Sequence, residues 1–261
     1  MFLTVASERA QKKSSGIDTP DLHIARTRED LESAFKLVYE SYTEAGLQEP
    51  NQFEMRILPQ QFLDNSDVVV AKSGGETIAT ATLLADSELG LPAESMYRDE
   101  INKLRDGGYR VAEVGCLADR RRSTTRFIKM FRQLSRIIAQ AADARGFNGL
   151  LAATHPRHAR FYIKQLGFRQ VGALRECPYV RGNPAVALLL DFDAIRSTDV
   201  GEHLFGSPYL PVELAPYHWN EQTRAHFSQV LEHRTKPNRC TNVYAAFESP
   251  TIPATELPQL V

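Results

Sequence analysis

A single carboxylate stands within an apolar stretch of the sequence, directly before a cluster of arginines. Glu113 is the only charged residue between Val111 and Ala118, in a run that is typical of a buried β-strand. A buried carboxylate has two common explanations. It pairs with a nearby arginine, or burial shifts its pKa toward the range in which it can take a proton from a substrate. The sequence by itself favours the structural pair.

The arginine cluster begins after this strand and continues into a predicted helix. Residues 119–136 contain seven basic residues against one acid. Because the start of a helix attracts anions, this cluster suits a phosphate or an acidic partner, and a solvated helix face explains it equally well. Nucleic acid fits poorly, since the net charge of the whole chain is -1 and no recognition motif is present. The basic residues are Arg120, Arg121, Arg122, Arg126, Lys129, Arg132 and Arg136.

A cysteine and two histidines could also take part in chemistry. Cys116 could act as a covalent nucleophile, but a cysteine in an apolar strand is usually an inert buried thiol. His155 and His158 are three residues apart, a spacing that metal ligands can have, yet the sequence offers no third ligand. We therefore expect a helix cap and a surface side chain here, and no metal site.

The composition is that of a globular protein without a membrane span. The chain has 261 residues, of which 43% are hydrophobic and 24% charged, enough for one domain of about 200 residues with an appendage or for two small domains. The three cysteines are far apart and odd in number, which favours a reducing, cytoplasmic compartment. The N-terminal apolar run is too short for a signal peptide, and residues 1–19 have the composition of a polar leader.

The elements that would position these residues alternate between strands and helices. A helix capped by Thr27 follows a first strand, and Gly74 and Gly75 lie at the turn of a predicted hairpin. The order predicts an α/β domain with a mixed central sheet flanked by helices and a βαβ crossover at its centre. The predicted strands are 22–25, 67–72, 76–84, 109–118, 148–154, 168–174 and 185–192, and the predicted helices are 27–42, 91–106, 124–145 and 156–166.

The texture of the sequence changes after Arg196. Half of the 14 prolines lie beyond Gly206, and only residues 220–233 have a helical pattern. We therefore divide the chain into a polar leader (1–19), a main α/β domain (20–196) and a C-terminal extension (197–261) that packs on the domain or is partly disordered.

Several motifs resemble a known family. The order of elements is similar to the GNAT acyltransferase fold, and His155-Pro-Arg-His-Ala-Arg-Phe-Tyr-Ile-Lys-Gln-Leu-Gly-Phe168 resembles the second signature of that fold. More specifically, Gly90-Leu-Pro, Glu113-Val-Gly-Cys-Leu-Ala118 and Gly182-Asn-Pro-Ala-Val resemble the FeeM-type long-chain N-acyl amino acid synthases, relatives of the acyl-homoserine lactone synthases. The resemblance covers roughly Ile24 to Phe192 and implies a GNAT-like fold.

One departure from the wider GNAT pattern concerns the acyl donor. CoA-dependent members place a glycine-rich loop after the central strand, where bare backbone amides hold the pyrophosphate. Here that place reads Arg120-Arg-Arg-Ser-Thr-Thr, without glycine. The resemblance implies acyl carrier protein, an acidic partner, as the donor of an acyl group on its phosphopantetheine, with acyl-CoA less favoured and no bound cofactor. The arginine cluster then becomes its docking face.

The resemblance also implies roles for individual residues. Glu113 becomes the base that deprotonates the acceptor amine, and it is now favoured over the structural pair. The backbone at Cys116 and Leu117 would hold the oxyanion, and Tyr162 lies where many GNAT enzymes carry a tyrosine acid, although packing explains it as well. Arg157 and Arg160 either bind the acceptor carboxylate or the carrier, or are solvated.

The function that the resemblance implies is transfer of a long-chain fatty acyl group from the thioester of acyl carrier protein to the amine of an amino acid, giving an N-acyl amino acid. An acyl-homoserine lactone synthase would share the donor and the glutamate. A CoA-dependent N-acetyltransferase is disfavoured by the missing glycines. The non-enzymatic alternative is a lipid-binding module on the same scaffold.

Overall fold

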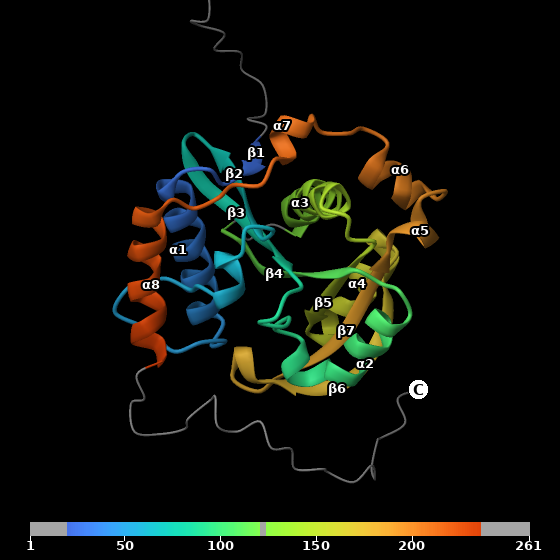
Figure 1. Ribbon diagram of the computed structural model, residues 1–261, viewed down its shortest axis with the longest axis horizontal. Coiled ribbons are helices and arrows are strands. Elements are labelled where there is room, and N and C mark those ends of the chain that lie inside the picture. Colours follow the sequence, from blue (N-terminus) through green and yellow to red (C-terminus); the bar gives the residue numbers. More distant parts are fainter. Residues whose placement is uncertain (1–19, 121–123, 236–261) are drawn as a thin grey trace, which may run out of the picture.

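The computed structural model describes residues 20–120 and 124–235, and it has a seven-stranded mixed sheet at its centre (Figure 1). The strand order is β1-β2-β3-β4-β5-β7-β6, and all neighbours are antiparallel except β4 and β5. The predicted α/β fold with a mixed sheet is confirmed, as is the βαβ unit β4-α3-β5. The strands are β1 (Asp21–Ile24), β2 (Asp67–Ser73), β3 (Glu76–Ala85), β4 (Val111–Asp119), β5 (Gly149–Thr154), β6 (Arg169–Cys177) and β7 (Asn183–Asp191).

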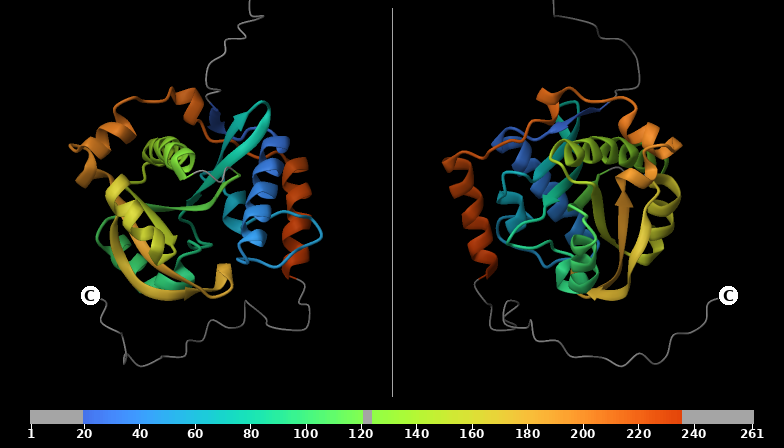
Figure 2. Two further views of the ribbon diagram at one scale, coloured as in Figure 1. Left: turned by 180° about the vertical axis from the view of Figure 1, so that it is seen from behind. Right: turned by 45° about the vertical axis from the view of Figure 1, so that its right-hand side comes forward.

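Helices cover both faces of the sheet (Figures 1 and 2). They begin and end where the local chemistry predicts: Thr27 Oγ1 accepts the N–H of Asp30 at 3.1 Å before α1, and Gly167 ends α4 at φ 72°. The helices are α1 (Arg28–Glu44), η1 (Pro59–Phe62), α2 (Glu94–Asp106), α3 (Thr124–Ala144), α4 (Pro156–Leu166), η2 (Pro178–Val180), α5 (Phe192–Ile195), α6 (Asp199–Phe205), α7 (Pro211–Leu214) and α8 (Glu221–Thr235).

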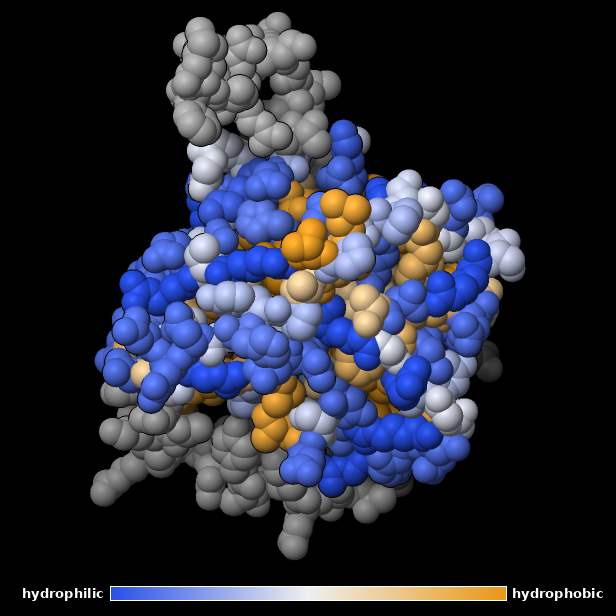
Figure 3. Space-filling model, turned by 45° about the horizontal axis from the view of Figure 1, so that its top comes forward, coloured by the Kyte–Doolittle hydropathy of each residue, from blue (hydrophilic) through white to orange (hydrophobic). Residues whose placement is uncertain are grey.

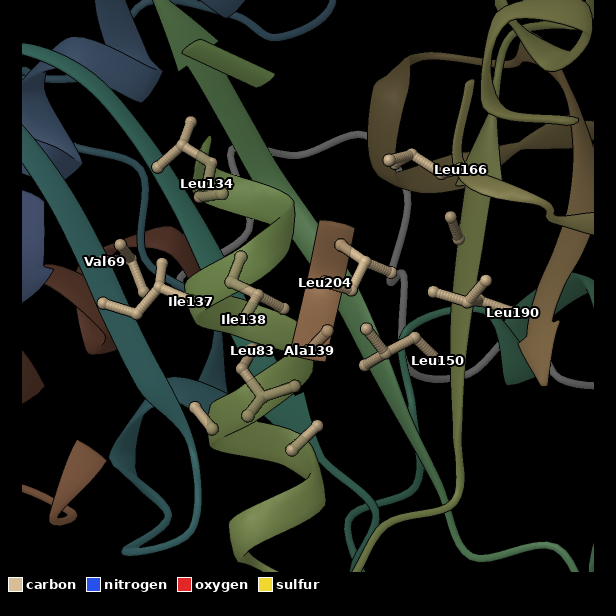
Figure 4. Close-up of a cluster of buried hydrophobic side chains, with 14 of the residues drawn as sticks. Val69, Leu83, Leu134, Ile137, Ile138, Ala139, Leu150, Leu166, Leu190 and Leu204 are labelled. Carbon is tan, nitrogen blue, oxygen red and sulfur yellow. The ribbon is translucent and has the colours of Figure 1, made fainter. Parts of the chain in front are cut away.

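The largest core lies between α3, α4 and one face of the sheet. In Figure 4, Ile137 and Ile138 of α3 lie against Val69 of β2 and Leu83 of β3, and all four side chains are buried. Each such side chain contributes roughly 1.5–3 kcal/mol to folding. Helices α1 and α2 cover the opposite face through separate apolar clusters. Because side chains alternate along a strand, neighbouring residues of β4 enter different clusters.

The C-terminal extension folds back onto the domain as far as the structure describes it. Its α8 lies beside α1, where Phe227 meets Phe35 edge-on with ring centroids 5.0 Å apart and Trp219 contacts both rings (Figure 2). The prediction of one helix after residue 196 is incomplete, since α6 and α7 precede α8. Helices of four to seven residues are too short to show a period in the sequence. The predicted leader, residues 1–19, and residues 236–261 lie outside the described part.

The surface offers little to an apolar ligand on the face shown in Figure 3, which is mainly hydrophilic with scattered apolar spots. The large apolar side chains that are exposed among the described residues are Leu89, Ile163, Leu174, Tyr179, Leu210 and Val212. Within residues 20–120 and 124–235, no helix has both the length and the apolar character that a membrane span requires.

Candidate active site

Glu113 lies where the central pair of strands separates. It is the last residue of β4 in register with β5, opposite Leu151, and beyond this pair the two parallel strands no longer match. Its side chain is 5% exposed and accepts the N–H of Ala93 at 2.8 Å through Oε2. Glu113 thus points to the face of the sheet that α2 covers, in the same direction as Val111.

The environment of Glu113 favours its protonated form. Burial raises the pKa of this carboxyl to about 7, the hydrogen bond from Ala93 opposes the shift, and the charge of Glu94 adds to it. No arginine or lysine pairs with Glu113 in residues 20–120 and 124–235. The structural ion pair that the sequence by itself favoured is therefore not found there.

A loop before α2 holds the hydrogen-bond donor of Glu113. It begins at Gly90, which adopts φ 66° and whose carbonyl accepts the side chain of Gln60 at 3.1 Å. The carboxylate of Glu94 accepts the N–H of Leu91 at 2.9 Å and also binds Arg105. The Gly-Leu-Pro stretch found in the sequence therefore has a geometric purpose, because it presents the Ala93 amide to Glu113.

A β-bulge follows Glu113 in the same strand. The ladder pairs Thr80 with Ala118 and Thr82 with Gly115, so Cys116 and Leu117 together oppose one residue of β3. Cys116 has φ 50°, a left-handed value that costs a residue other than glycine about 1–2 kcal/mol. Strained backbone of this kind is concentrated at functional sites. The bulge redirects the backbone at the two positions that the sequence proposed for the oxyanion.

An apolar cavity lies on the other face of β4. Its volume is about 30 Å³. Val114 reaches it because it alternates in direction with Glu113, and Leu117 reaches it because the extra residue of the bulge shifts the alternation by one position. Helix α3 supplies much of its wall, including Phe131 and Ile138. The separated strands thus place a buried carboxyl on one face and an apolar cavity on the other. The remaining wall comes from Ala81, Leu134, Ser135, Leu150, Tyr162, Leu166, Phe168 and Leu190.

Tyr162 belongs to the wall of this cavity. Its ring lies edge-on to Phe131 at 4.9 Å and to Phe168 at 5.5 Å. Burial raises the pKa of Tyr162 to about 12, and its side chain hydrogen-bonds to that of Thr154 at the end of β5. The phenol therefore stays protonated at neutral pH. Its ring packs in the cavity wall, and its O–H keeps the proton that a hydrogen-bond donor needs.

The predicted carrier-docking residues are only partly visible. Arg120 is exposed and pairs with Glu40 at 3.0 Å and with Glu76. Lys129 is exposed and Arg132 is half-buried. Arg121 and Arg122 lie outside the described residues, and so does the side chain of Arg126.

The residues predicted to hold the acceptor lie on a surface. Arg157 and Arg160 are exposed on α4, whereas Glu113 is buried, and Arg157 donates to His158 Nε2 at 3.1 Å. His155 caps α4 by accepting the N–H of Arg157 at 3.2 Å, as predicted. In the described part of the chain, no three His, Cys, Asp or Glu side chains gather as metal ligands would.

Sequence reasoning missed a buried arginine beside the site. Arg56 is 4% exposed and donates to Gln48 Oε1 at 3.1 Å and to the carbonyl of Tyr179 at 2.8 Å. Its guanidinium lies over the ring of Tyr42, 4.7 Å from the centroid. The sequence does carry a signal, since Arg56 stands alone among Met55, Ile57 and Leu58 as Glu113 does in its strand.

The fold and the divided strands define a GNAT-like acyltransferase. The model of the family described as N-acyl amino acid synthase FeeM matches residues 33–191, more than half of the chain. The chain belongs to this family and is an N-acyltransferase. No curated protein sequence matches it.

Solved structures share the fold, and two acyl synthases are among them. FeeM, an N-acyl amino acid synthase from uncultured soil microbes, superposes with a TM-score of 0.59 at 23% identity, over 72% of this chain and 99% of that one. BjaI, a CoA-dependent acyl-homoserine lactone synthase, gives 0.51 at 13% identity, over 73% and 90%. At these identities the likeness concerns the fold alone.

Proposed function

We propose that this protein transfers a long-chain fatty acyl group from the thioester of acyl carrier protein to the amine of an amino acid. The observation that carries the proposal is the buried Glu113 at the separation of β4 and β5, with an apolar cavity on the opposite face. The family to which the chain belongs is described by an N-acyl amino acid product, which supports the same reaction class.

Glu113 is the base of this mechanism. The amine of an amino acid is an ammonium at neutral pH, and it must lose a proton before it can attack a thioester. A carboxyl with a pKa of about 7 is divided between its two forms at that pH and accepts the proton, directly or through a water molecule. The Ala93 amide fixes the direction of this carboxylate.

The remaining steps balance without a cofactor. The amine nitrogen forms a bond to the thioester carbonyl carbon, and the oxyanion binds at the backbone of Cys116 and Leu117. The intermediate collapses with cleavage of the carbon–sulfur bond, and the thiolate leaves. Tyr162 donates a hydrogen bond to the departing sulfur. The attacking nitrogen loses two protons between ammonium and amide: one protonates the departing thiolate, and the other passes through Glu113 to the solvent. The products are an amide and the free phosphopantetheine thiol.

The cavity at Leu117 and Tyr162 receives the start of the acyl chain. At about 30 Å³ it has room for roughly one water-sized group. A long chain therefore requires the side chains of α3 to rearrange against the sheet. Phe131 and Leu134 in this wall are apolar, so the rearranged wall would surround a hydrocarbon chain with apolar side chains.

The donor is proposed from charge. Arg120, Lys129 and Arg132 place positive charge at the start of α3, and the sequence has three more arginines in the same stretch, Arg121, Arg122 and Arg126. Such a cluster of charge attracts an acidic carrier protein and accelerates its encounter. We place the reaction in the cytoplasm, where the buried thiols of Cys116 and Cys177 stay reduced.

The proposal is tested by incubating the purified full chain with acyl carrier protein thioesters of several chain lengths and a pool of amino acids. We expect release of thiol and a new amide whose mass identifies the acyl chain and the acceptor. Acetyl-CoA and S-adenosylmethionine serve as competing substrates. Absence of both thiol release and amide would exclude the proposal, and a lactone product or preferred use of acetyl-CoA would replace it.

A further inference from the structure

Arg56 is a buried cation without a buried anion. It makes no ion pair with a carboxylate in the part of the chain that the structure describes. Its contacts are an amide oxygen, a carbonyl oxygen and the face of the Tyr42 ring. Because a buried charge is costly unless it is paired, such an arrangement is stabilised when an anion binds.

Two hydrogen-bond donors at this place are buried and unused. The Nε of Arg56 and the Nε2 of Gln48 have no hydrogen-bond partner among the described residues, and the side chain of Gln48 is 6% exposed. Buried donors normally have a partner, so each unsatisfied one calls for an explanation. The two residues are already joined through the Gln48 oxygen, and together they present N–H groups and a positive charge.

This donor pair lies beside the catalytic strand. Tyr42, on which Arg56 stacks, packs in one apolar cluster with Cys116 and Ala118 of β4. From the same segment as Arg56, Gln60 binds the carbonyl of Gly90 in the loop that holds Glu113.

A third side chain connects the donor pair with Glu113. Burial raises the pKa of the Cys177 thiol, the backbone of Tyr179 lowers it, and the charges of Glu113 and Arg56 act on it in opposite directions. Tyr179 also accepts the hydrogen bond from Arg56. The base and the buried arginine therefore share one neighbourhood.

We propose that Arg56 and Gln48 bind the α-carboxylate of the acceptor amino acid. The inference rests on the proposed function, because it assigns the binding determinant of the same acceptor. A planar guanidinium matches a carboxylate, and a free amino acid carries an ammonium next to its carboxylate. Binding the carboxylate at Arg56 directs the ammonium toward Glu113. The pair selects amino acids over simple amines.

The test compares acceptors that differ only in the carboxylate. Leucine is paired with isoamylamine and phenylalanine with phenethylamine, each with the acyl carrier protein thioester and the full chain. We expect the wild type to prefer the amino acid in both pairs. Loss of a charge-assisted hydrogen bond predicts that Arg56→Met and Gln48→Met lower kcat/KM for the amino acid by about 10- to 100-fold, mainly through KM, with the amine changed little. Arg56→Lys should recover part of the loss.

Arg181→Met is the matched control. Arg181 follows η2 in the same turn as Tyr179, is exposed and pairs with Glu49 next to Gln48, so its loss disturbs the same region without removing a buried donor. It should retain the preference for the amino acid. Gln48→Met keeps Arg56 in place, which preserves the test where an Arg56 variant does not fold.

The failure of this inference differs from the failure of the proposed function. A wild type that acylates amines and amino acids equally, or Arg56 and Gln48 variants that lose both activities in the same proportion, would overturn the carboxylate site while the transferase stands. A wild type that acylates neither class would overturn the transferase itself.

Discussion

The backbone N–H of Ala93 lies 2.8 Å from Oε2 of Glu113 and joins the loop before α2 to the central strand. The donor is neutral and the carboxyl is buried, so the bond orients the carboxylate but only partly offsets the cost of charging it. The direction of the proposed base is therefore set by a loop that is 20 residues away in the sequence.

Glu113→Gln should lower kcat/KM by about 100-fold or more, because general base catalysis contributes a factor of that order. The glutamine oxygen can still accept the Ala93 amide, so the fold should remain. In the wild type we expect kcat/KM to rise with pH through about 7, where Glu113 loses its proton, and this inflection should disappear in the variant. Steady-state kinetics between pH 5 and 9 measure both.

Glu100→Gln is the control for that experiment. It makes the same chemical change at a carboxylate of α2. This carboxylate forms an ion pair with Arg175 at 2.6 Å and not with the proposed base. Its activity and pH profile should match the wild type. A Glu113→Gln enzyme with an unimpaired rate would remove Glu113 from the mechanism.

Gly90→Ala should impair activity through the position of the loop. Gly90 has φ 66°, and an added Cβ would lie 3.1 Å from the carboxylate of Glu94, which holds the same loop. Gly74→Ala is the matched control, since Gly74 has φ 59° and nothing within 4 Å of the added atom. Both variants should lose about 1 kcal/mol of unfolding free energy, and only Gly90→Ala should also lower kcat. Equal activities would show that the loop tolerates the shift.

The fold could be predicted because its signals are local. The glycine pair at the β2–β3 turn, the Thr27 cap and the apolar stripe of α3 each act within a few residues, and the structure has the corresponding elements. Glu113 could be singled out for a related reason, since one charge in an apolar strand is visible in the sequence.

The surroundings of Glu113 could not be predicted in the same way. The contacts of Arg56 join a segment without periodicity to Tyr179, 123 residues later. The Ala93 bond and the left-handed Cys116 depend likewise on how separate elements meet. Sequence patterns report which side chains are buried, but not which buried groups lie together.

Tyr162→Phe should reduce kcat by about 10-fold and leave KM for the amino acid nearly unchanged. A phenol with a pKa of about 12 is a weaker acid than a thiol near 8.5, so it stabilises the leaving sulfur by a hydrogen bond rather than by full proton transfer. One such bond accounts for about 1–2 kcal/mol. Single-turnover thiol release measures the step, and an unchanged rate would leave Tyr162 with packing alone.

Ile138→Ala should shift the preferred acyl chain toward greater length. Ile138 lines the cavity, whereas its neighbour Ile137 is equally buried in the same core but does not line it. Both truncations should cost about 2–5 kcal/mol of stability. Competition among carrier thioesters of different lengths should reveal a change only for Ile138→Ala. A shift shared by Ile137→Ala would indicate general loosening of α3 instead.

Glu113 should also make the stability of the protein depend on pH. The pKa of this carboxyl is about 7 in the fold, against the ordinary glutamate value of 4.5 in the unfolded chain. Below pH 4.5 the carboxyl is protonated in both the folded and the unfolded chain, so the free energy of unfolding does not change with pH through this group. Between pH 4.5 and 7 the unfolded state releases the proton first, so the free energy of unfolding falls with rising pH.

Above pH 7 the loss should level off at about 3 kcal/mol, from 1.36 kcal/mol for each pKa unit. Glu113→Gln lacks this proton, so it should be more stable than the wild type at pH 8 by about that amount, and close to it at pH 4. Urea unfolding at the two pH values measures the difference. A difference independent of pH would mean that burial does not raise the pKa of Glu113, and a carboxyl with an ordinary pKa would be a much weaker base for the acceptor ammonium.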